Sequence, residues 1–191
     1  MGHFTHFYKM LLPAREDVWI ETGTYRGDSI DIALECGFRE LHSIEVCPRL
    51  YEAAAPRFAG NQRVHLHLGS SPDVLDRLLT PAITSRSTVI WLDAHFQGYA
   101  RDEMDEVRGE CPLLEELDVI VSRTWSAPVL VAIDDVRLFQ GEFPEDVALR
   151  AEAWPTIEDV RTRLEGWRLV ETRQCLFADD PRLRSFLPKN R

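Results

Sequence analysis

One stretch near the start of the chain decides its fold: Val18-Trp19-Ile20-Glu21-Thr22-Gly23-Thr24-Tyr25-Arg26-Gly27-Asp28-Ser29. A short apolar run ends in an acid, two glycines four residues apart follow, and a helix-like segment begins after them. This order predicts the end of a parallel strand that turns through a nucleotide-binding loop into a helix. A second apolar run, residues 41–46, reaches Glu45, which lies 24 residues after Glu21.

Short apolar runs and amphipathic segments of helical length alternate along the rest of the chain. We expect strands at 18–20, 41–46, 64–68, 88–92, 129–133, 167–172 and 175–177, and helices at 29–36, 48–58, 70–79, 112–122 and 156–164. Strands that alternate with helices predict an α/β fold with one doubly wound, mostly parallel sheet and helices on both faces. The chain is expected to form a single domain, 1–191, with an N-terminal helical extension at 1–16.

The composition narrows the class of protein. With 191 residues, 45% hydrophobic and 28% charged, the profile is that of an ordinary globular domain. A formal net charge of −10 argues against nucleic acid and anionic membranes as partners. The sequence has neither a long apolar run nor a signal peptide, so we expect a cytoplasmic protein. Its four cysteines are far apart, which predicts free thiols there.

Acids follow four of the apolar runs: Glu21, Glu45, Asp93 and the pair Asp134-Asp135. Because the carboxyl ends of parallel strands hold the ligand in open α/β sheets, these acids predict a binding site. An acid before the first glycine would repel a pyrophosphate and attract an amine. S-adenosylmethionine carries an ammonium group and no phosphate, and its ribose hydroxyls would donate to Glu45. We therefore expect this cofactor.

These motifs resemble those of class I S-adenosylmethionine-dependent methyltransferases. The chain is most similar to small bacterial members related to the macrocin O-methyltransferase and cephalosporin hydroxylase families. The resemblance covers about residues 17–140 and is carried by residues 21–29, Ser43-Ile44-Glu45, Trp91-Leu92-Asp93-Ala94-His95 and Ile133-Asp134-Asp135. It implies a Rossmann-like methyltransferase fold.

The resemblance also implies a set of cofactor-binding residues: Glu21, Thr22, Gly23, Gly27, Ser29, Glu45, Ser70, Ser71 and Asp93. In this set Gly23 and Gly27 let the backbone approach the methionine part, and Glu45 binds the ribose hydroxyls. The turn at 69–71 would lie by the adenine. Many relatives carry an acid where Ser70 stands, so this chain departs from their pattern at that point.

The same families bind a divalent metal through acids that correspond to Asp93, Asp134 and Asp135. Oxygen ligands of this kind suit Mg²⁺, which lowers the pKa of a bound hydroxyl. The alternative is that Asp134 caps the next segment while Asp135 is merely solvated. His95 is a candidate general base beside Asp93. The alternative for His95 is a hydrogen-bonding scaffold role.

The expected function is a metal-assisted methyl transfer to an oxygen, or less favourably a nitrogen, of a small metabolite. Two alternatives stay open at this level. One is a non-methylating, metal-dependent enzyme on the same fold, such as a hydroxylase component or a hydrolase. The other is an inactive cofactor-binding protein. A homodimer could complete the substrate site. Residues 99–106 are most simply a solvated acidic loop, and the alternative is a lid that covers the substrate. His65 and His67 are expected to be solvated.

Overall fold

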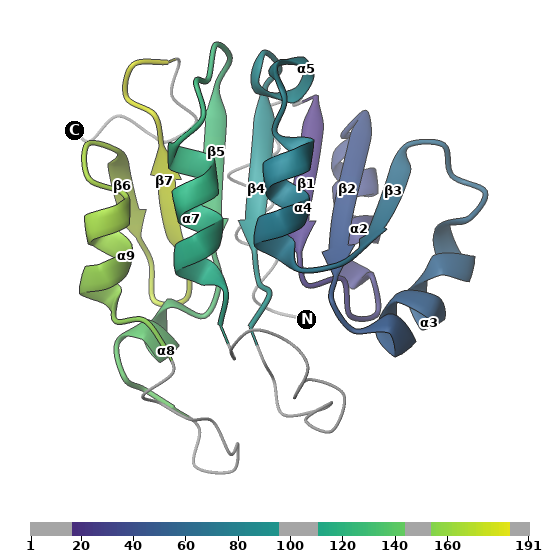
Figure 1. Ribbon diagram of the computed structural model, residues 1–191, viewed down its shortest axis with the longest axis horizontal. Coiled ribbons are helices and arrows are strands. Elements are labelled where there is room, and N and C mark those ends of the chain that lie inside the picture. The colour runs from purple at the N-terminus through teal and green to yellow at the C-terminus, as the bar shows by residue number, and fades with distance from the viewer. Residues whose placement is uncertain (1–16, 96–110, 144–153, 184–191) are drawn as a thin grey trace.

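The computed structural model describes residues 17–95, 111–143 and 154–183 (Figure 1). The described residues form one seven-stranded sheet in the order β3-β2-β1-β4-β5-β7-β6. The strands are β1 (Val18–Thr22), β2 (Glu40–Glu45), β3 (Val64–Leu68), β4 (Thr88–Leu92), β5 (Val129–Ile133), β6 (Arg168–Glu171) and β7 (Leu176–Asp179). The pairs from β3 to β5 are parallel, whereas β7 is antiparallel to both β5 and β6.

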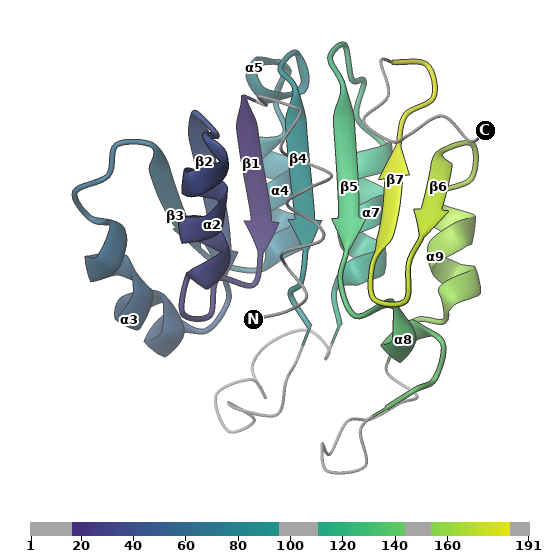
Figure 2. The same cartoon turned by 180° about the vertical axis from the view of Figure 1, so that it is seen from behind.

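Helices cover both faces of this sheet, as expected for a doubly wound fold. They are α2 (Asp28–Cys36), α3 (Pro48–Phe58), α4 (Ser71–Leu78), α5 (Pro81–Thr84), α7 (Leu113–Val121), α8 (Val136–Phe139) and α9 (Ile157–Arg163). One face carries α4, α7 and α9, and the opposite face carries α2, as the two views in Figures 1 and 2 show. Each face has its own apolar cluster, so the core lies in two layers on either side of the sheet.

The central strands β1, β4 and β5 are buried along their whole length. Their near-continuous apolar sequences are explained by this burial on two faces. On β1 the alternating side chains divide between the layers, since Val18 and Ile20 join one cluster and Trp19 joins the other. The edge strand β3 is much more exposed than these central strands.

The carboxyl ends of β2, β1, β4 and β5 meet at one edge of the sheet. The register pairs Thr22 with both Ile44 and Leu92, and it pairs Leu92 with Ile133. The acids that follow these strands are therefore neighbours in space although they are far apart in the sequence. This edge is the place where the sequence predicted a ligand.

Several details differ from the sequence-based expectations. The strand β1 continues to Thr22, and the short helices α5 and α8 were not predicted. His65 is exposed as expected, but His67 is half-buried and shares a 3.0 Å hydrogen bond with the ring of His42, so its predicted full solvation was wrong. The two histidines come together because β3 pairs in parallel with β2. The predicted extension at 1–16 and the predicted lid both lie outside the described residues.

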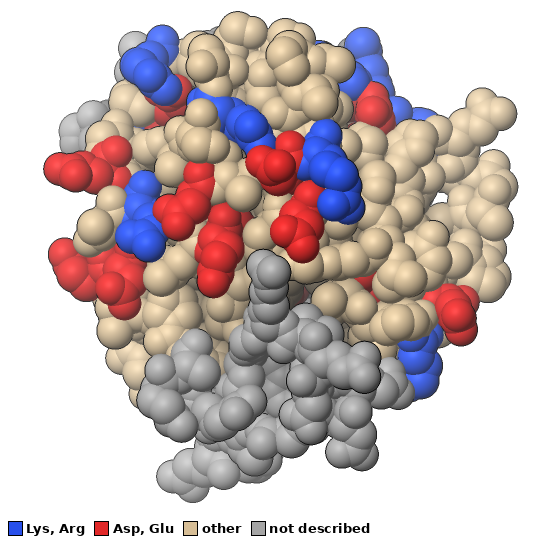
Figure 3. Space-filling model, in the orientation of Figure 1, with Lys and Arg blue, Asp and Glu red and all other residues tan. Residues whose placement is uncertain are grey.

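The surface over α4, α7 and α9 carries acidic and basic side chains beside one another (Figure 3). Arg123 pairs with Asp76 of α4, and Arg163 pairs with Asp118 of α7 across a 2.7 Å contact. These pairs link neighbouring helices on a single face. Within the described ranges, none of the helices has both the length and the apolar character that crossing a membrane requires. The four cysteines are free thiols, as predicted.

Candidate functional site

The loop after β1 is shaped by two glycines that no other residue could replace without strain. Gly23 has a φ of 87°, and a Cβ atom there would lie 2.6 Å from the carbonyl oxygen of Asp93. Gly27 has a φ of 78°, and a Cβ atom there would meet the ring of Phe58 at 2.5 Å. Positive φ angles and such close approaches favour glycine. The loop is therefore packed closely against the end of β4 and against α3.

Glu45 joins this loop to the end of β2. Its Oε2 accepts a hydrogen bond from the backbone N–H of Tyr25, and its Oε1 accepts one from the N–H of Cys47, both at 2.9 Å. Each carboxylate oxygen has two lone pairs, so both can accept a further hydrogen bond. This arrangement fits an acceptor for two adjacent ribose hydroxyls, which is the role that the sequence predicted for Glu45.

Glu21 lies within β1 and is fully buried. Its Oε1 accepts a 2.7 Å hydrogen bond from Ser43, and its Oε2 accepts a 3.0 Å bond from the indole of Trp19. Burial raises the pKa of Glu21, while hydrogen bonds from Ser43, Trp19 and Ser29 act in the opposite direction. The carboxyl group thus connects the start of α2 to β1 and β2 through hydrogen bonds. Its contact with an ammonium group stays a prediction.

His95 stands between two carboxylates at the end of β4. Its Nδ1 lies 3.4 Å from Asp93, and its Nε2 lies 3.4 Å from Asp135. Burial lowers the pKa of His95, but the hydrogen bond to Asp135 and the charges of the three aspartates outweigh burial, so the pKa is raised. Burial raises the pKa of Asp93, whereas the hydrogen bond with His95 lowers that of Asp135. The ionisation of each of these groups therefore depends on that of its neighbours.

The acidic pair after β5 adopts an unusual backbone. Asp135 has a φ of 49°, so the chain turns sharply there and both carboxylates reach the edge of the sheet. Asp134 is held in place because its Oδ1 accepts hydrogen bonds from the Asp135 N–H at 2.8 Å and from the thiol of Cys175 at 3.3 Å. Arg137 lies 3.3 Å from Asp135. Asp135 is the first residue before α8, but its side chain makes no capping hydrogen bond.

The geometry does not support the predicted magnesium site at Asp93, Asp134 and Asp135, which stays a prediction. Among the residues that the structure describes, no group of three His, Cys, Asp or Glu side chains is placed to hold one. The imidazole of His95 lies between Asp93 and Asp135.

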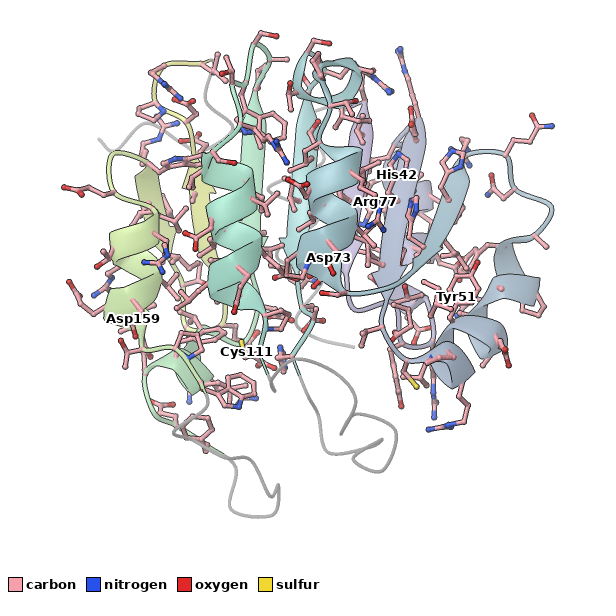
Figure 4. The ribbon with its side chains drawn as sticks, in the orientation of Figure 1. His42, Tyr51, Asp73, Arg77, Cys111 and Asp159 are labelled. Carbon is pink, nitrogen blue, oxygen red and sulfur yellow. The ribbon has the colours of Figure 1, made fainter. Side chains whose placement is uncertain are left out.

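A small cavity opens beside His95 at this edge. It has a volume of about 10 Å³, room for about one water molecule, and it is lined by Leu92, Ala94, His95, Cys111, Pro112, Leu113, Glu116, Ile133 and Phe139. Cys111, labelled in Figure 4, marks its position just before the start of α7. The ring of Trp154 packs 5.4 Å from that of His95 and 5.8 Å from that of Phe139. An apolar, partly aromatic wall therefore adjoins His95 and its neighbouring carboxylates.

Glu116 is the functional candidate that sequence reasoning missed. It lies in the first turn of α7, is 1% exposed and lines the cavity. Burial raises its carboxyl pKa to about 7, although hydrogen bonds from Ser71 and Thr22 lower it. Among the described residues, its Oε1 has no hydrogen-bond partner. In the sequence it looks like an ordinary acid near a helix start, so no local signal distinguishes it.

The other predicted cofactor residues gather at the same edge. Thr22 is fully buried, and its hydroxyl accepts a 3.3 Å hydrogen bond from the N–H of Asp93. Ser70 precedes the first turn of α4 and Ser71 begins it. The N–H of Gly69 donates a 2.9 Å hydrogen bond to the carbonyl of Glu45, so the turn after β3 is fixed directly beside Glu45.

Comparisons with known proteins relate this fold to a set of solved structures. No family model matches the sequence, and no curated protein matches it. Among solved structures, the chain is similar to the SAH-bound methyltransferase PaMTH1 of Podospora anserina (16% identity, TM-score 0.63, covering 91% of this chain and 76% of that one). It is also similar to the O-methyltransferase TomG of Streptomyces achromogenes in complex with SAM (19% identity, TM-score 0.61, covering 91% of this chain and 77% of that one). A third similar structure is an O-methyltransferase of Bacillus cereus in complex with SAH (14% identity, TM-score 0.62, covering 94% of this chain and 82% of that one). The chain therefore has the Rossmann-like fold of S-adenosylmethionine-dependent methyltransferases.

Proposed function

We propose that this chain, which has the fold just described, is an S-adenosylmethionine-dependent methyltransferase that acts on an oxygen atom of a small metabolite. The observation that carries the proposal is the placement of Glu45 and the glycine loop beside the cluster of Asp93, His95 and Asp135. One half of this edge suits an adenosine, and the other half suits proton transfer. Two of the similar structures, TomG and the Bacillus cereus protein, are O-methyltransferases.

The residues around the first loop would bind the cofactor. When bound, S-adenosylmethionine supplies the methyl group from its sulfonium. Glu45 would accept hydrogen bonds from the ribose hydroxyls, and its two backbone contacts already hold the carboxylate in one orientation. Preorganisation of this kind lowers the entropy lost on binding. The glycine at 23 leaves the backbone uncovered at the point where the methionine part would approach.

His95 would remove the proton from the acceptor hydroxyl. Neutral imidazole takes the proton as the new O–C bond forms, and the broken S–C bond leaves its electron pair on sulfur. Asp93 and Asp135 then stabilise the imidazolium, because both carboxylates lie 3.4 Å from ring nitrogens. The aromatic wall of Trp154 and Phe139 would exclude water from this step. Metal assistance stays a prediction, and no step above depends on it.

The proposal is tested first by binding. Calorimetric titration with S-adenosylhomocysteine, with and without Mg²⁺, should show micromolar affinity, and an effect of Mg²⁺ would support the metal prediction. Complete absence of binding would overturn the methyltransferase function while leaving the fold intact. Binding without transfer to any acceptor in a broad screen of labelled products would favour the inactive cofactor-binding protein instead.

A second test addresses His95. Once an acceptor is found, His95→Gln should lower kcat by about 10²- to 10⁴-fold, the usual contribution of a general base. His65→Gln, which changes an exposed histidine on β3, serves as the matched control and should keep full activity. Because the pKa of His95 is raised, its basic form is populated only at higher pH, and the rate should still increase above about pH 6.5. A rate that is independent of pH and unchanged in His95→Gln would refute the role of general base.

A further inference from the structure

Three of the six histidines of the chain come together outside the candidate site. His42 lies on β2, and His65 and His67 lie on β3. Residues two apart on a strand point to the same face of the sheet, so His65 and His67 share one face. The parallel register pairs His42 with His65, which brings His42 to that face as well. The centroid of the His42 ring lies 5.0 Å from that of His65 and 5.3 Å from that of His67.

The hydrogen bonds of His42 leave one of its ring nitrogens directed at His67. Its Nε2 lies 2.9 Å from Oε1 of Glu40, and a carboxylate only accepts, so the ring donates its Nε2 proton there. Arg86 pairs with the other oxygen of Glu40. The Nδ1 of neutral His42 then carries a lone pair, 3.0 Å from Nε2 of His67. A carboxylate that accepts from the outer nitrogen is the usual support of a metal-ligating histidine.

The two partly enclosed rings are neutral, which is the form that binds a metal ion. Burial lowers the pKa of His42 more than the hydrogen bond and the charge of Glu40 raise it. Burial also lowers the pKa of His67 to about 4, with smaller contributions from the neighbouring histidines and from Arg77 of α4. Arg77, labelled with His42 in Figure 4, is exposed, and the charge of Arg86 is balanced by Glu40. An anion would require protonated rings, so the cluster favours a cation.

We propose that His42, His65 and His67 form a binding site for a divalent transition metal such as Zn²⁺, in which Glu40 orients His42. Three imidazoles and a water molecule are a common set of zinc ligands, whereas Mg²⁺ prefers oxygen. Two Zn–N bonds of about 2.0 Å at a tetrahedral angle place their nitrogens about 3.3 Å apart. The nitrogens of His42 and His67 are 3.0 Å apart, so this pair needs little adjustment to hold the ion.

The third ring completes the site by moving. Among the described residues, no three such side chains already surround a metal position, because the ring of His65 stacks against that of His42. His65 is exposed, so its side chain can rotate to another staggered conformation at low cost. On binding, the ion replaces the hydrogen bond between the other two rings, and His67 carries its proton on Nδ1. The bound metal would then link the exposed edge strand β3 to β2.

The experiment is calorimetric titration of the whole chain with Zn²⁺ in a buffer without chelators. The wild type should bind one Zn²⁺ per chain with micromolar or tighter affinity. His65→Gln and His67→Gln should each weaken binding at least about tenfold, and Glu40→Gln should weaken it about 10- to 100-fold, the usual effect of losing such a support. His95→Gln, which alters the separate cluster of one histidine and its acids, is the matched control and should keep the wild-type affinity.

A second readout is thermal unfolding. Zn²⁺ should raise the Tm of the wild type and raise that of His65→Gln by less, because a ligand that binds only the folded chain stabilises it. The substitution at His65 changes an exposed side chain, so this variant should fold without Zn²⁺ as the wild type does.

Several results would overturn the proposal. Absence of Zn²⁺ binding by the wild type would do so, and so would equal affinities in the wild type, His65→Gln and His67→Gln. Binding that is lost in His95→Gln instead would assign the ion to the carboxyl edge of the sheet. One Zn²⁺ per two chains, together with a dimer in sedimentation, would place the ion between two copies and contradict a site within one chain.

Discussion

Replacing Glu116 by glutamine should remove a pH-dependent loss of stability. In the unfolded chain this carboxyl group titrates near its ordinary pKa of 4.5, whereas burial raises the pKa to about 7 in the folded protein. Between these two values the folded state holds a proton that the unfolded chain has released. The free energy of unfolding therefore falls as the pH rises from 4.5 through 7. Glutamine resembles the protonated acid but does not titrate.

The size of the effect follows from the two pKa values. Each pKa unit corresponds to about 1.36 kcal/mol, so the change from 4.5 to about 7 corresponds to about 3 kcal/mol over the full range. Most of this falls between pH 5 and pH 8, where we expect the variant to gain about 2 to 3 kcal/mol relative to the wild type. No discount for solvent screening is needed, because the side chain is 1% exposed.

The assay is urea unfolding of the wild type and of Glu116→Gln, followed by circular dichroism, at several pH values between 5 and 8. Taking the difference between the two proteins cancels the titration of all other groups that the substitution leaves unchanged. Glu115→Gln, at an exposed position in the same turn, should show no such divergence. If the stability gap between Glu116→Gln and the wild type stays constant within about 0.5 kcal/mol, the reasoning from the buried carboxyl group is refuted.

Three further predictions follow from the site and the sheet. Glu45→Ala should weaken the binding of S-adenosylhomocysteine by about 1–3 kcal/mol in calorimetry, since it removes a charged acceptor, and unchanged affinity would contradict its role. In urea unfolding, Gly23→Ala should lower the free energy of unfolding by about 1–3 kcal/mol more than the control Gly37→Ala. Both glycines have φ near 90°, but only at position 23 would a Cβ atom meet the carbonyl of Asp93. Equal losses would show that the close approach has no cost. Burial is the main reason that the pKa of His67 is lowered from 6.5 to about 4 in the folded protein. The unfolded chain therefore binds the proton first, and the free energy of unfolding decreases as the pH falls below 6.5. His67→Gln should therefore lose less stability between pH 7 and pH 5 in urea unfolding, and identical acid sensitivity in both proteins would argue against this origin.

The sequence was sufficient to predict the class of fold and most of its elements. Strands such as β4 and β5 are buried on both faces, so their apolar runs are visible locally. The alternation of strands and helices then leaves few topologies. The antiparallel placement of β7 between β5 and β6 was not predicted, because pairing direction depends on contacts that no local pattern records. The one-turn helices α5 and α8 were missed because four residues carry too little periodicity.

The acidic half of the candidate site could also be predicted from sequence, for a simple geometric reason. Parallel strands end at a common edge, so acids that follow them must be neighbours. The structure bears this out in bringing Asp93 and Asp135 to either side of one imidazole. The position of His95 between them was beyond prediction, because it depends on the sharp turn at Asp135 and on the packing of Trp154.

The sequence by itself thus determined where the strands lie and at which edge a ligand would bind, since both are consequences of short-range patterns and of chain direction. Only the tertiary structure decided which polar groups are buried there. Glu115 and Glu116 are identical neighbours in one helical turn, yet only Glu116 faces the ends of β1 and α4. Burial depends on the rotation of α7 against the sheet, which is set by contacts between residues far apart in the chain.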